Sequence, residues 1–132
     1  MCCRGVFDST ELRKVKLPST LQRLEDYVFS ECRSLREVVF GEKSALEYIG
    51  KYTFYCCVSL RSITLPEGLK TINEDAINSS GLEEVTLSGT LNEVNYDAFK
   101  DCANLKTVYV GDGCEASLLD LGLSDSIKVV PL

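Results

Sequence analysis

The chain has 132 residues, a length typical of one domain, and 45% of them are hydrophobic and 26% charged. Its net charge of −6 argues against a general nucleic-acid binder, which needs a basic surface to displace counterions from phosphates. No apolar run approaches the roughly 18 residues of a membrane-spanning helix, and no apolar signal segment follows Met1. We therefore expect neither nucleic-acid binding nor membrane insertion.

Three apolar columns recur along the chain once every 22 to 25 residues. A period of this size is the signature of a solenoid, because no single unit can bury its own apolar face. The sequence therefore predicts a mainly β solenoid, a stack of about five coils with a main sheet on one face. The columns are Phe7, Phe29, Phe54, Ile77 and Phe99; Leu12, Leu35, Leu60, Leu82 and Leu105; and Val15, Val38, Ile63, Val85 and Val108.

Each copy opens with a short alternating stretch. In residues 60–65, Ile63 and Leu65 fall on one side and Ser62 and Thr64 on the other, which predicts a half-buried strand. Each stretch meets a proline, which has no amide to donate, or a glycine or serine that favours a turn. The equivalent stretches are 12–17, 35–40, 82–87 and 105–110, and the breakers are Pro18, Gly41, Pro66, Ser88-Gly89 and Gly111.

A second apolar pair follows each turn, for example Leu69 and Ile72, and then a small residue precedes the Phe column. We expect a second extended stretch or short strand there, followed by a compact corner seated on Phe, with short strands or 3₁₀ turns away from the main sheet. Two extra residues lie around 41–44. Insertions at turns are tolerated because the backbone there can reach water.

The end of the chain departs from the repeat. Residues 115–121 favour a short helix closed by Gly122, and residues 127–130 predict a last strand stopped by Pro131. Because a terminal coil exposes apolar edge, we predict an array over residues 1–111 and a C-terminal capping helix and strand over residues 112–132. Only six residues precede Phe7, so we expect an incomplete first coil, an array that continues upstream, and possible edge-to-edge association through that uncapped coil.

Two stretches carry a known repeat motif. They are Leu65-Pro66-x-x-Leu69-x-x-Ile72-x-x-x-Ala76-Ile77 and Ala98-Phe99-x-x-Cys102-x-x-Leu105-x-x-Val108. Over roughly residues 6 to 111 the chain resembles the BspA-like (Treponema pallidum-type) leucine-rich repeat. Thr10 and Ser80 stand where that repeat has Cys. The resemblance implies a surface or secreted protein of the kind implicated in adhesion to host proteins or other cells.

Seven cysteines and no histidine are the most distinctive chemical feature. Cys32, Cys57 and Cys102 share one repeat position, and we expect a buried thiol ladder there because free Cys packs as a small hydrophobe. Because the adjacent Cys56 and Cys57 cannot easily both point inward, we expect Cys56 to be the exposed thiol. Zinc binding would need a CxxC pair or a His partner, so we expect no metal site. With the commonest general base absent and no phosphate-binding loop, we predict no catalytic residues and no cofactor.

The outward positions of the strands offer a candidate partner-binding surface. One column is Arg13, Arg36, Arg61, Glu83 and Lys106, and the other is Lys16, Val39, Thr64, Thr86 and Tyr109. Stacked like charges repel, which favours selection for a partner; the alternative is a solvated face neutralised by Glu37 and Glu84. The candidate residues are Arg13, Arg36, Arg61, Lys106, Val39, Thr64, Thr86 and Tyr109, with Val39, Tyr109 and Tyr48 as exposed apolar positions.

The sequence thus favours a noncatalytic protein–protein interaction module. The resemblance implies part of a cell-surface or secreted adhesin whose partner is a host matrix or cell-surface protein. The alternative is an intracellular leucine-rich-repeat scaffold in the cytoplasm, because unpaired thiols suit a reducing compartment. A cysteine-dependent enzyme that uses Cys56 is the third hypothesis.

Overall fold

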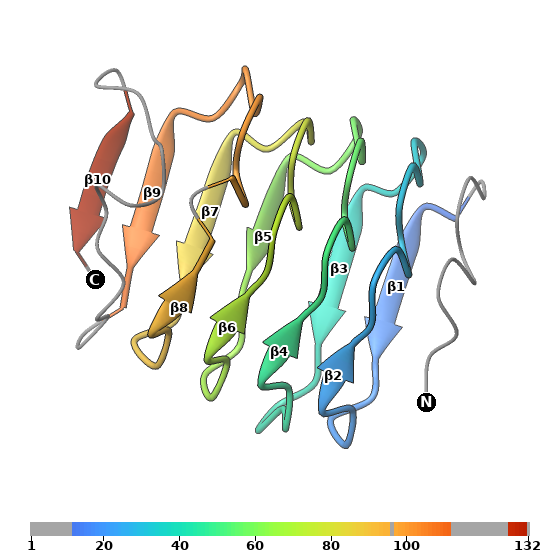
Figure 1. Ribbon diagram of the computed structural model, residues 1–132, viewed down its shortest axis with the longest axis vertical. Coiled ribbons are helices and arrows are strands. Elements are labelled where there is room, and N and C mark those ends of the chain that lie inside the picture. The colour runs from blue at the N-terminus through green and yellow to red at the C-terminus, as the bar shows by residue number, and fades with distance from the viewer. Residues whose placement is uncertain (1–11, 96, 112–126, 132) are drawn as a thin grey trace.

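The computed structural model describes residues 12–95, 97–111 and 127–131, and these form a parallel β-solenoid (Figure 1). The first four coils each contribute one strand to a long-strand face and one to a short-strand face, and β9 and β10 extend the long-strand face. The long-strand face consists of β1 (Lys14–Leu17), β3 (Glu37–Phe40), β5 (Ser62–Thr64), β7 (Glu84–Leu87), β9 (Thr107–Val110) and β10 (Lys128–Pro131). The short-strand face consists of β2 (Arg23–Leu24), β4 (Tyr48–Ile49), β6 (Thr71–Ile72) and β8 (Glu93–Val94).

The predicted β solenoid is confirmed, and so is the last strand, although β10 includes Pro131, which was expected to stop it. β10 pairs in parallel with β9, with Val129 opposite Val108. The capping helix predicted for residues 115–121 lies outside the described residues.

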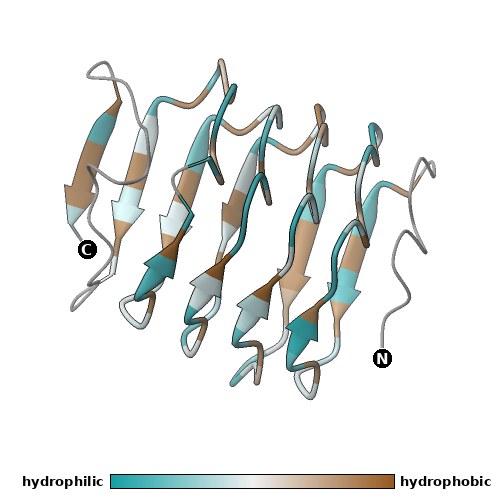
Figure 2. Ribbon diagram, viewed as in Figure 1, coloured by the Kyte–Doolittle hydropathy of each residue, from teal (hydrophilic) through white to brown (hydrophobic). Residues whose placement is uncertain are grey.

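The core lies between the two faces and follows the repeat columns. In Figure 2 apolar and polar residues alternate along the strands, as period-two burial requires. The described members of the three columns are buried from the second copy onward, whereas Leu12 and Val15 of the first copy are half-buried. The buried members are Leu35, Leu60, Leu82 and Leu105; Phe29, Phe54, Ile77 and Phe99; and Val38, Ile63, Val85 and Val108.

The corners seated on the Phe column are turns, and the short strands expected away from the main sheet are β2, β4, β6 and β8. Each corner contains residues in the left-handed region, such as Tyr52 at φ 57° and Cys56 at φ 58°. Bulky side chains rarely adopt this conformation, so it must be stabilised from outside the residue. The stabilisation comes from the next coil: the Phe54 amide donates to the Ala76 carbonyl at 2.7 Å.

The main sheet expected on one face is interrupted. The long-strand face divides into a two-stranded sheet, β1-β3, and a four-stranded sheet, β10-β9-β7-β5, whereas the short strands form one continuous sheet, β2-β4-β6-β8. The interruption falls beside the insertion at residues 41–44. Phe40 is only half-buried at the position where Leu17 and Leu65 are buried.

Pro66 contributes to the interruption. At the equivalent position two coils further on, the Gly111 amide donates to the Leu87 carbonyl at 2.8 Å. Proline has no amide hydrogen, so Pro66 cannot close the ladder on Phe40 in the same way.

Gly81 shows how closely the coils approach each other. A Cβ atom on this residue would lie 2.1 Å from the Val58 carbonyl oxygen of the preceding coil. The Gly81 amide also donates to the Cys57 carbonyl at 3.1 Å, which ties the backbone in place.

We predict that Gly81→Ala lowers the free energy of unfolding by about 3 kcal/mol, because the clash is with backbone that cannot rotate away. Gly41→Ala is the matched control, since its Cβ would meet Ser19 Cβ at 3.1 Å, a contact that a small shift relieves. Urea unfolding followed by circular dichroism measures both. Equal stability of the two variants would contradict the expected close packing.

Candidate interaction surface

The predicted surface residues of the second column share a register on the long-strand face. Lys16 lies opposite Val39, Thr64 opposite Thr86, and Thr86 opposite Tyr109. Lys16 and Thr64 are exposed, whereas Val39, Thr86 and Tyr109 are half-buried. The structure therefore brings these residues together as two rows, separated between Val39 and Thr64 by the interruption of the sheet.

The basic residues of the first column are all exposed, and each directly precedes its strand. The Arg36 amide donates to the Arg13 carbonyl at 2.7 Å, and the Lys106 amide to the Glu83 carbonyl at 2.9 Å, so successive members lie on adjacent coils. Arg61 forms an ion pair with Glu83 of the next coil.

The neutralisation expected from neighbouring acids is only partial. Glu37 pairs with Lys14 at 3.5 Å rather than with an arginine of the column. Glu84, Arg36 and Lys106 form no ion pair among the described residues. Three cations of the column, Arg13, Arg36 and Lys106, therefore have no neutralising acid among those residues.

A groove of about 480 Å³ lies where the sheet is interrupted. Its walls come from β3 and β5 and from the turns that follow them. The charged residues that line it are Arg36, Glu37, Lys43 and Glu67. The sequence analysis did not predict a groove, although the two-residue insertion after Phe40 marked its position.

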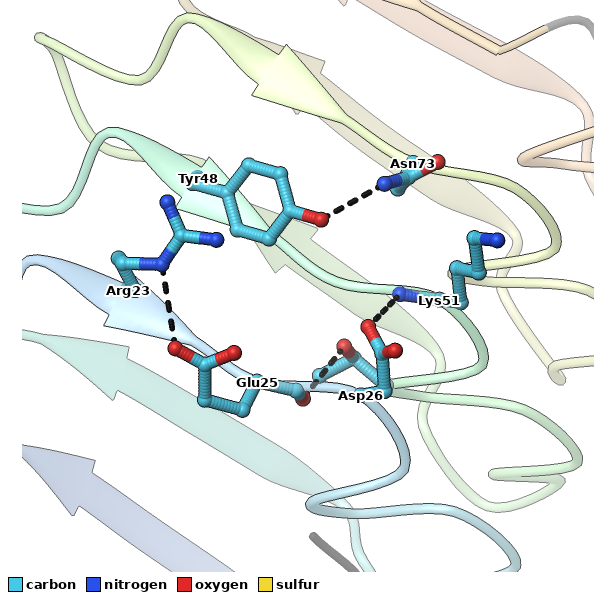
Figure 3. A network of polar contacts seen from close by, with 7 residues as sticks. Arg23, Glu25, Asp26, Tyr48, Lys51 and Asn73 are labelled. Carbon is cyan, nitrogen blue, oxygen red and sulfur yellow. Dashed lines mark hydrogen bonds and ion pairs between the residues drawn. The ribbon is translucent and has the colours of Figure 1, made fainter. Parts of the chain in front are cut away.

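The short-strand face carries a polar network that the sequence analysis missed (Figure 3). The Arg23 guanidinium lies 3.9 Å from the centroid of the Tyr48 ring and also pairs with Glu25 at 3.1 Å. Asn73 Nδ2 donates to the Tyr48 hydroxyl at 2.7 Å. Tyr48, expected as an exposed apolar position, is half-buried and engaged by the coils on both sides.

The same network holds the backbone of adjacent coils together. The Lys51 amide donates to Asp26 Oδ1 at 2.8 Å, and Thr53 Oγ1 donates to the Glu25 carbonyl of the preceding coil at 3.3 Å. A Cβ atom at Gly50 would lie 2.6 Å from Asp26 Oδ1. The polar residues of the network therefore have a structural role, which is to join adjacent coils.

The buried thiol ladder is confirmed at all three of its positions. Cys32, Cys57 and Cys102 are buried, Cys56 is half-buried, and none of the four is part of a disulfide. Cys57 Sγ donates to the Phe29 carbonyl at 3.2 Å, and Cys102 Sγ to the Ile77 carbonyl at 3.1 Å. Each of these two thiols thus donates to a corner carbonyl of the preceding coil. Burial raises the pKa of Cys57 and of Cys102, the latter against the opposing effect of hydrogen bonds from Ser80.

The described part of the chain shows no cluster of three or more Cys, Asp or Glu side chains that could hold a metal ion. Within the same residues, no helix has the length and apolar character needed to cross a membrane.

Comparison with known proteins places the repeat in a family. The family model of the BspA type leucine rich repeat region matches residues 3–117 in six copies. A comparison with curated proteins finds no match.

Two solved structures resemble the chain over most of its length. One is a leucine-rich repeat protein from Bacteroides ovatus, with 27% identity and a TM-score of 0.76, covering 92% of this chain and 30% of that protein. The other is the T. pallidum leucine rich repeat protein, with 25% identity and a TM-score of 0.74, covering 97% of this chain and 60% of that protein. The chain therefore spans less than two thirds of either structure.

We predict that iodoacetamide modifies Cys56 of the native protein well before Cys57 and Cys102. The thiolate is the reactive form, and burial both shields the two ladder thiols and raises their pKa. Peptide mapping by mass spectrometry after timed alkylation measures the order. Denaturation in urea should make the three rates similar, and modification of Cys57 in step with Cys56 before denaturation would contradict the prediction.

We also predict that the protein loses stability as the pH rises above about 9. A Cys57 pKa raised in the folded state means that the unfolded chain releases this proton first, so ionisation of the thiol above its ordinary pKa of 9.0 favours unfolding. One such group lowers the free energy of unfolding by about 1 kcal/mol at pH 10. Urea unfolding at pH 8 and at pH 10 tests this prediction. Between these pH values the free energy of unfolding should fall less in the Cys57→Ala variant than in the parent chain.

Proposed function

The chain belongs to the BspA-type leucine-rich repeat family, and from that membership we propose that it is a noncatalytic protein-interaction module of a cell-surface or secreted adhesin. Leucine-rich repeat proteins are typically protein-interaction proteins, and solenoids bind through their extended faces. The proposed partner is a host matrix or cell-surface protein, in keeping with the adhesive family that the repeats resemble. No cofactor is part of this proposal.

The single observation that carries the proposal is the exposed basic column on an acidic protein. Arg36 and Lys106 form no ion pair among the described residues, although the net charge of −6 provides acids in excess. Exposed charges without local partners favour association with a surface of opposite sign, because such charges steer encounter and suppress wrong partners. The half-buried Val39, Thr86 and Tyr109 beside the column supply apolar contact area.

An intracellular scaffold is the second candidate, and the cysteines favour it. None of the four described cysteines is part of a disulfide, as is usual in a reducing compartment. Brief protease treatment of intact source cells, followed by detection with an antibody to this chain, separates the two. Loss of the signal supports the surface location, and full protection supports the intracellular scaffold.

Two predictions about the ends of the chain remain predictions. They are the division into an array over residues 1–111 and a cap over residues 112–132, and edge-to-edge association through the first coil. Residues 1–11 and 112–126, on which both depend, lie outside the described part of the chain.

We predict that Arg36→Glu combined with Arg61→Glu weakens capture of the partner by about tenfold or more, because two cations of the proposed surface become anions. The melting temperature should stay nearly unchanged, since exposed ion pairs contribute about 1 kcal/mol at most. Capture of matrix and cell-surface proteins on an array, with melting followed by circular dichroism, provides both readouts.

The matched control is Lys70→Glu combined with Lys100→Glu. Lys70 pairs with Glu47 as Arg61 pairs with Glu83, and Lys100, like Arg36, forms no ion pair among the described residues. Neither control residue belongs to the basic column. Capture reduced equally in both double variants would indicate a nonspecific charge effect, and capture unchanged in the Arg36/Arg61 variant would refute the proposed surface.

A further inference from the structure

We propose that a hollow on the short-strand face binds an arginine side chain of a protein partner, with its guanidinium between the Tyr48 ring and the Glu93 carboxylate. The site lies across the core from the basic column (Figure 1), so the proposal goes beyond the proposed function and does not depend on it. Arginine is the expected occupant because its planar guanidinium stacks on aromatic rings and also binds carboxylates through two parallel hydrogen bonds.

The hollow lies along one row of side chains that crosses the four short strands. Arg23 lies opposite Tyr48, and Tyr48 lies opposite Thr71. Thr71 in turn lies opposite Glu93. Because Thr71 has the shortest side chain of the four, it leaves space between its two neighbours in the row. A hollow of about 270 Å³ occupies this part of the face, and its lining comes from β4, β6 and β8 and the residues that follow β6 and β8.

The ring of Tyr48 already binds one guanidinium. Arg23 lies 3.9 Å from the ring centroid and pairs with Glu25 (Figure 3). Arg23 belongs to β2, on one side of Tyr48, whereas the hollow lies over β6 and β8, on the other side. In this row, only the short side chain of Thr71 stands on the hollow's side of the ring. A second cation placed there would be attracted by the ring in the same way, since the attraction acts within about 6 Å of the centroid.

The charge of the hollow favours a cation. Glu93 is the only charged residue among the described residues that line it. Its carboxylate forms no ion pair within the part of the chain that the structure describes. Lys70 directly precedes Thr71, but it pairs with Glu47 at 3.1 Å. The hollow therefore has an acid without a counter-ion, and the Thr71 hydroxyl offers a further acceptor for a guanidinium N–H.

The dimensions suit a single side chain. Two strand spacings, about 9.6 Å in all, separate β4 from β8. A guanidinium at the distance that Arg23 adopts, 3.9 Å from the ring, would lie above β6 and within reach of the Glu93 side chain. The volume of the hollow is just below the range of about 300–1,000 Å³ usual for drug-sized ligands. Repulsion between the two guanidinium groups would be limited, because Glu25 neutralises Arg23 and Glu93 would neutralise the second.

The test titrates the isotope-labelled full chain with a blocked pentapeptide whose central arginine is flanked by serine and glycine. Amide chemical shifts in NMR spectra report where the peptide binds, and we expect the changes at Tyr48, Thr71 and Glu93. The ring current of Tyr48 should also move the side-chain proton signals of the bound arginine upfield. The control peptide carries citrulline, which has the shape of arginine without its charge, and it should bind at least about tenfold more weakly.

Two variants test the site from the side of the protein. Glu93→Gln removes the charge and keeps the shape, and it should weaken binding about tenfold. Glu84→Gln is its matched control, because Glu84 is also exposed and forms no ion pair among the described residues, but lies on the long-strand face. Thr71→Arg places a guanidinium of the chain itself in the hollow and should abolish binding. Thr64→Arg makes the same charge change on the long-strand face and should leave binding unchanged. Circular dichroism confirms that all four variants are folded.

Several results would overturn the proposal. They are an absence of shift changes at the hollow, equal binding of the arginine and citrulline peptides, and equal binding to the parent chain and the Glu93→Gln variant. Methyl glycosides are titrated in parallel. Shift changes at the hollow caused by a glycoside and not by the arginine peptide would mean that the site holds a sugar, and would also overturn the proposal.

The same titration separates this proposal from the proposed function. The variant with Arg36→Glu and Arg61→Glu should bind the arginine peptide like the parent chain, because both substitutions lie on the long-strand face. Conversely, the Glu93→Gln variant should still capture a partner that uses the basic column. Failure of either expectation in one assay therefore leaves the result of the other assay intact.

Discussion

Every coil depends on its neighbours for both apolar burial and hydrogen bonding, and the rest of the structure follows from this dependence. A coil of 22 to 25 residues is too small to enclose a core, so its Leu, Val and Phe side chains are buried by stacking on the next copy. The corners show the dependence most directly. Tyr52 and Cys56 adopt left-handed backbone angles that cost energy in isolation, and they persist because the corner amides donate to the carbonyls of the following coil.

The polar atoms inside the stack follow the same rule. No buried side-chain nitrogen or oxygen among the described residues lacks a hydrogen-bond partner. The column of cysteines belongs to this pattern, since the thiols of Cys57 and Cys102 donate to corner carbonyls one coil away. Ser80 occupies the equivalent position in the coil between them, which is a short polar replacement of similar size. Packing and hydrogen bonding therefore account for Cys57 and Cys102.

The repeat columns could be predicted from the sequence because burial in a stack leaves a periodic signal. The surface could be predicted less well, because its contacts depend on the reach of side chains across coils. Glu37 pairs with Lys14 and not with an arginine of the column, and Tyr48 is engaged by Arg23 of the coil before and Asn73 of the coil after. The interruption between β3 and β5 had a visible cause in the insertion after Phe40. Its consequence depended on how that turn, Phe40 and Pro66 pack together, which no single stretch of sequence reveals.

Adjacent coils are joined by backbone hydrogen bonds on the long-strand face, on the short-strand face and at the corners. The stack can tolerate this interruption because only the ladder on the long-strand face is affected. Between the same two coils, Ile49 pairs with Ile72 on the short-strand face, and the Phe54 amide donates to the Ala76 carbonyl at the corner. The missing bonds each contribute about 1 kcal/mol, and exposed backbone groups recover part of this from water. A gap in one ladder therefore exposes strand edges without separating the coils.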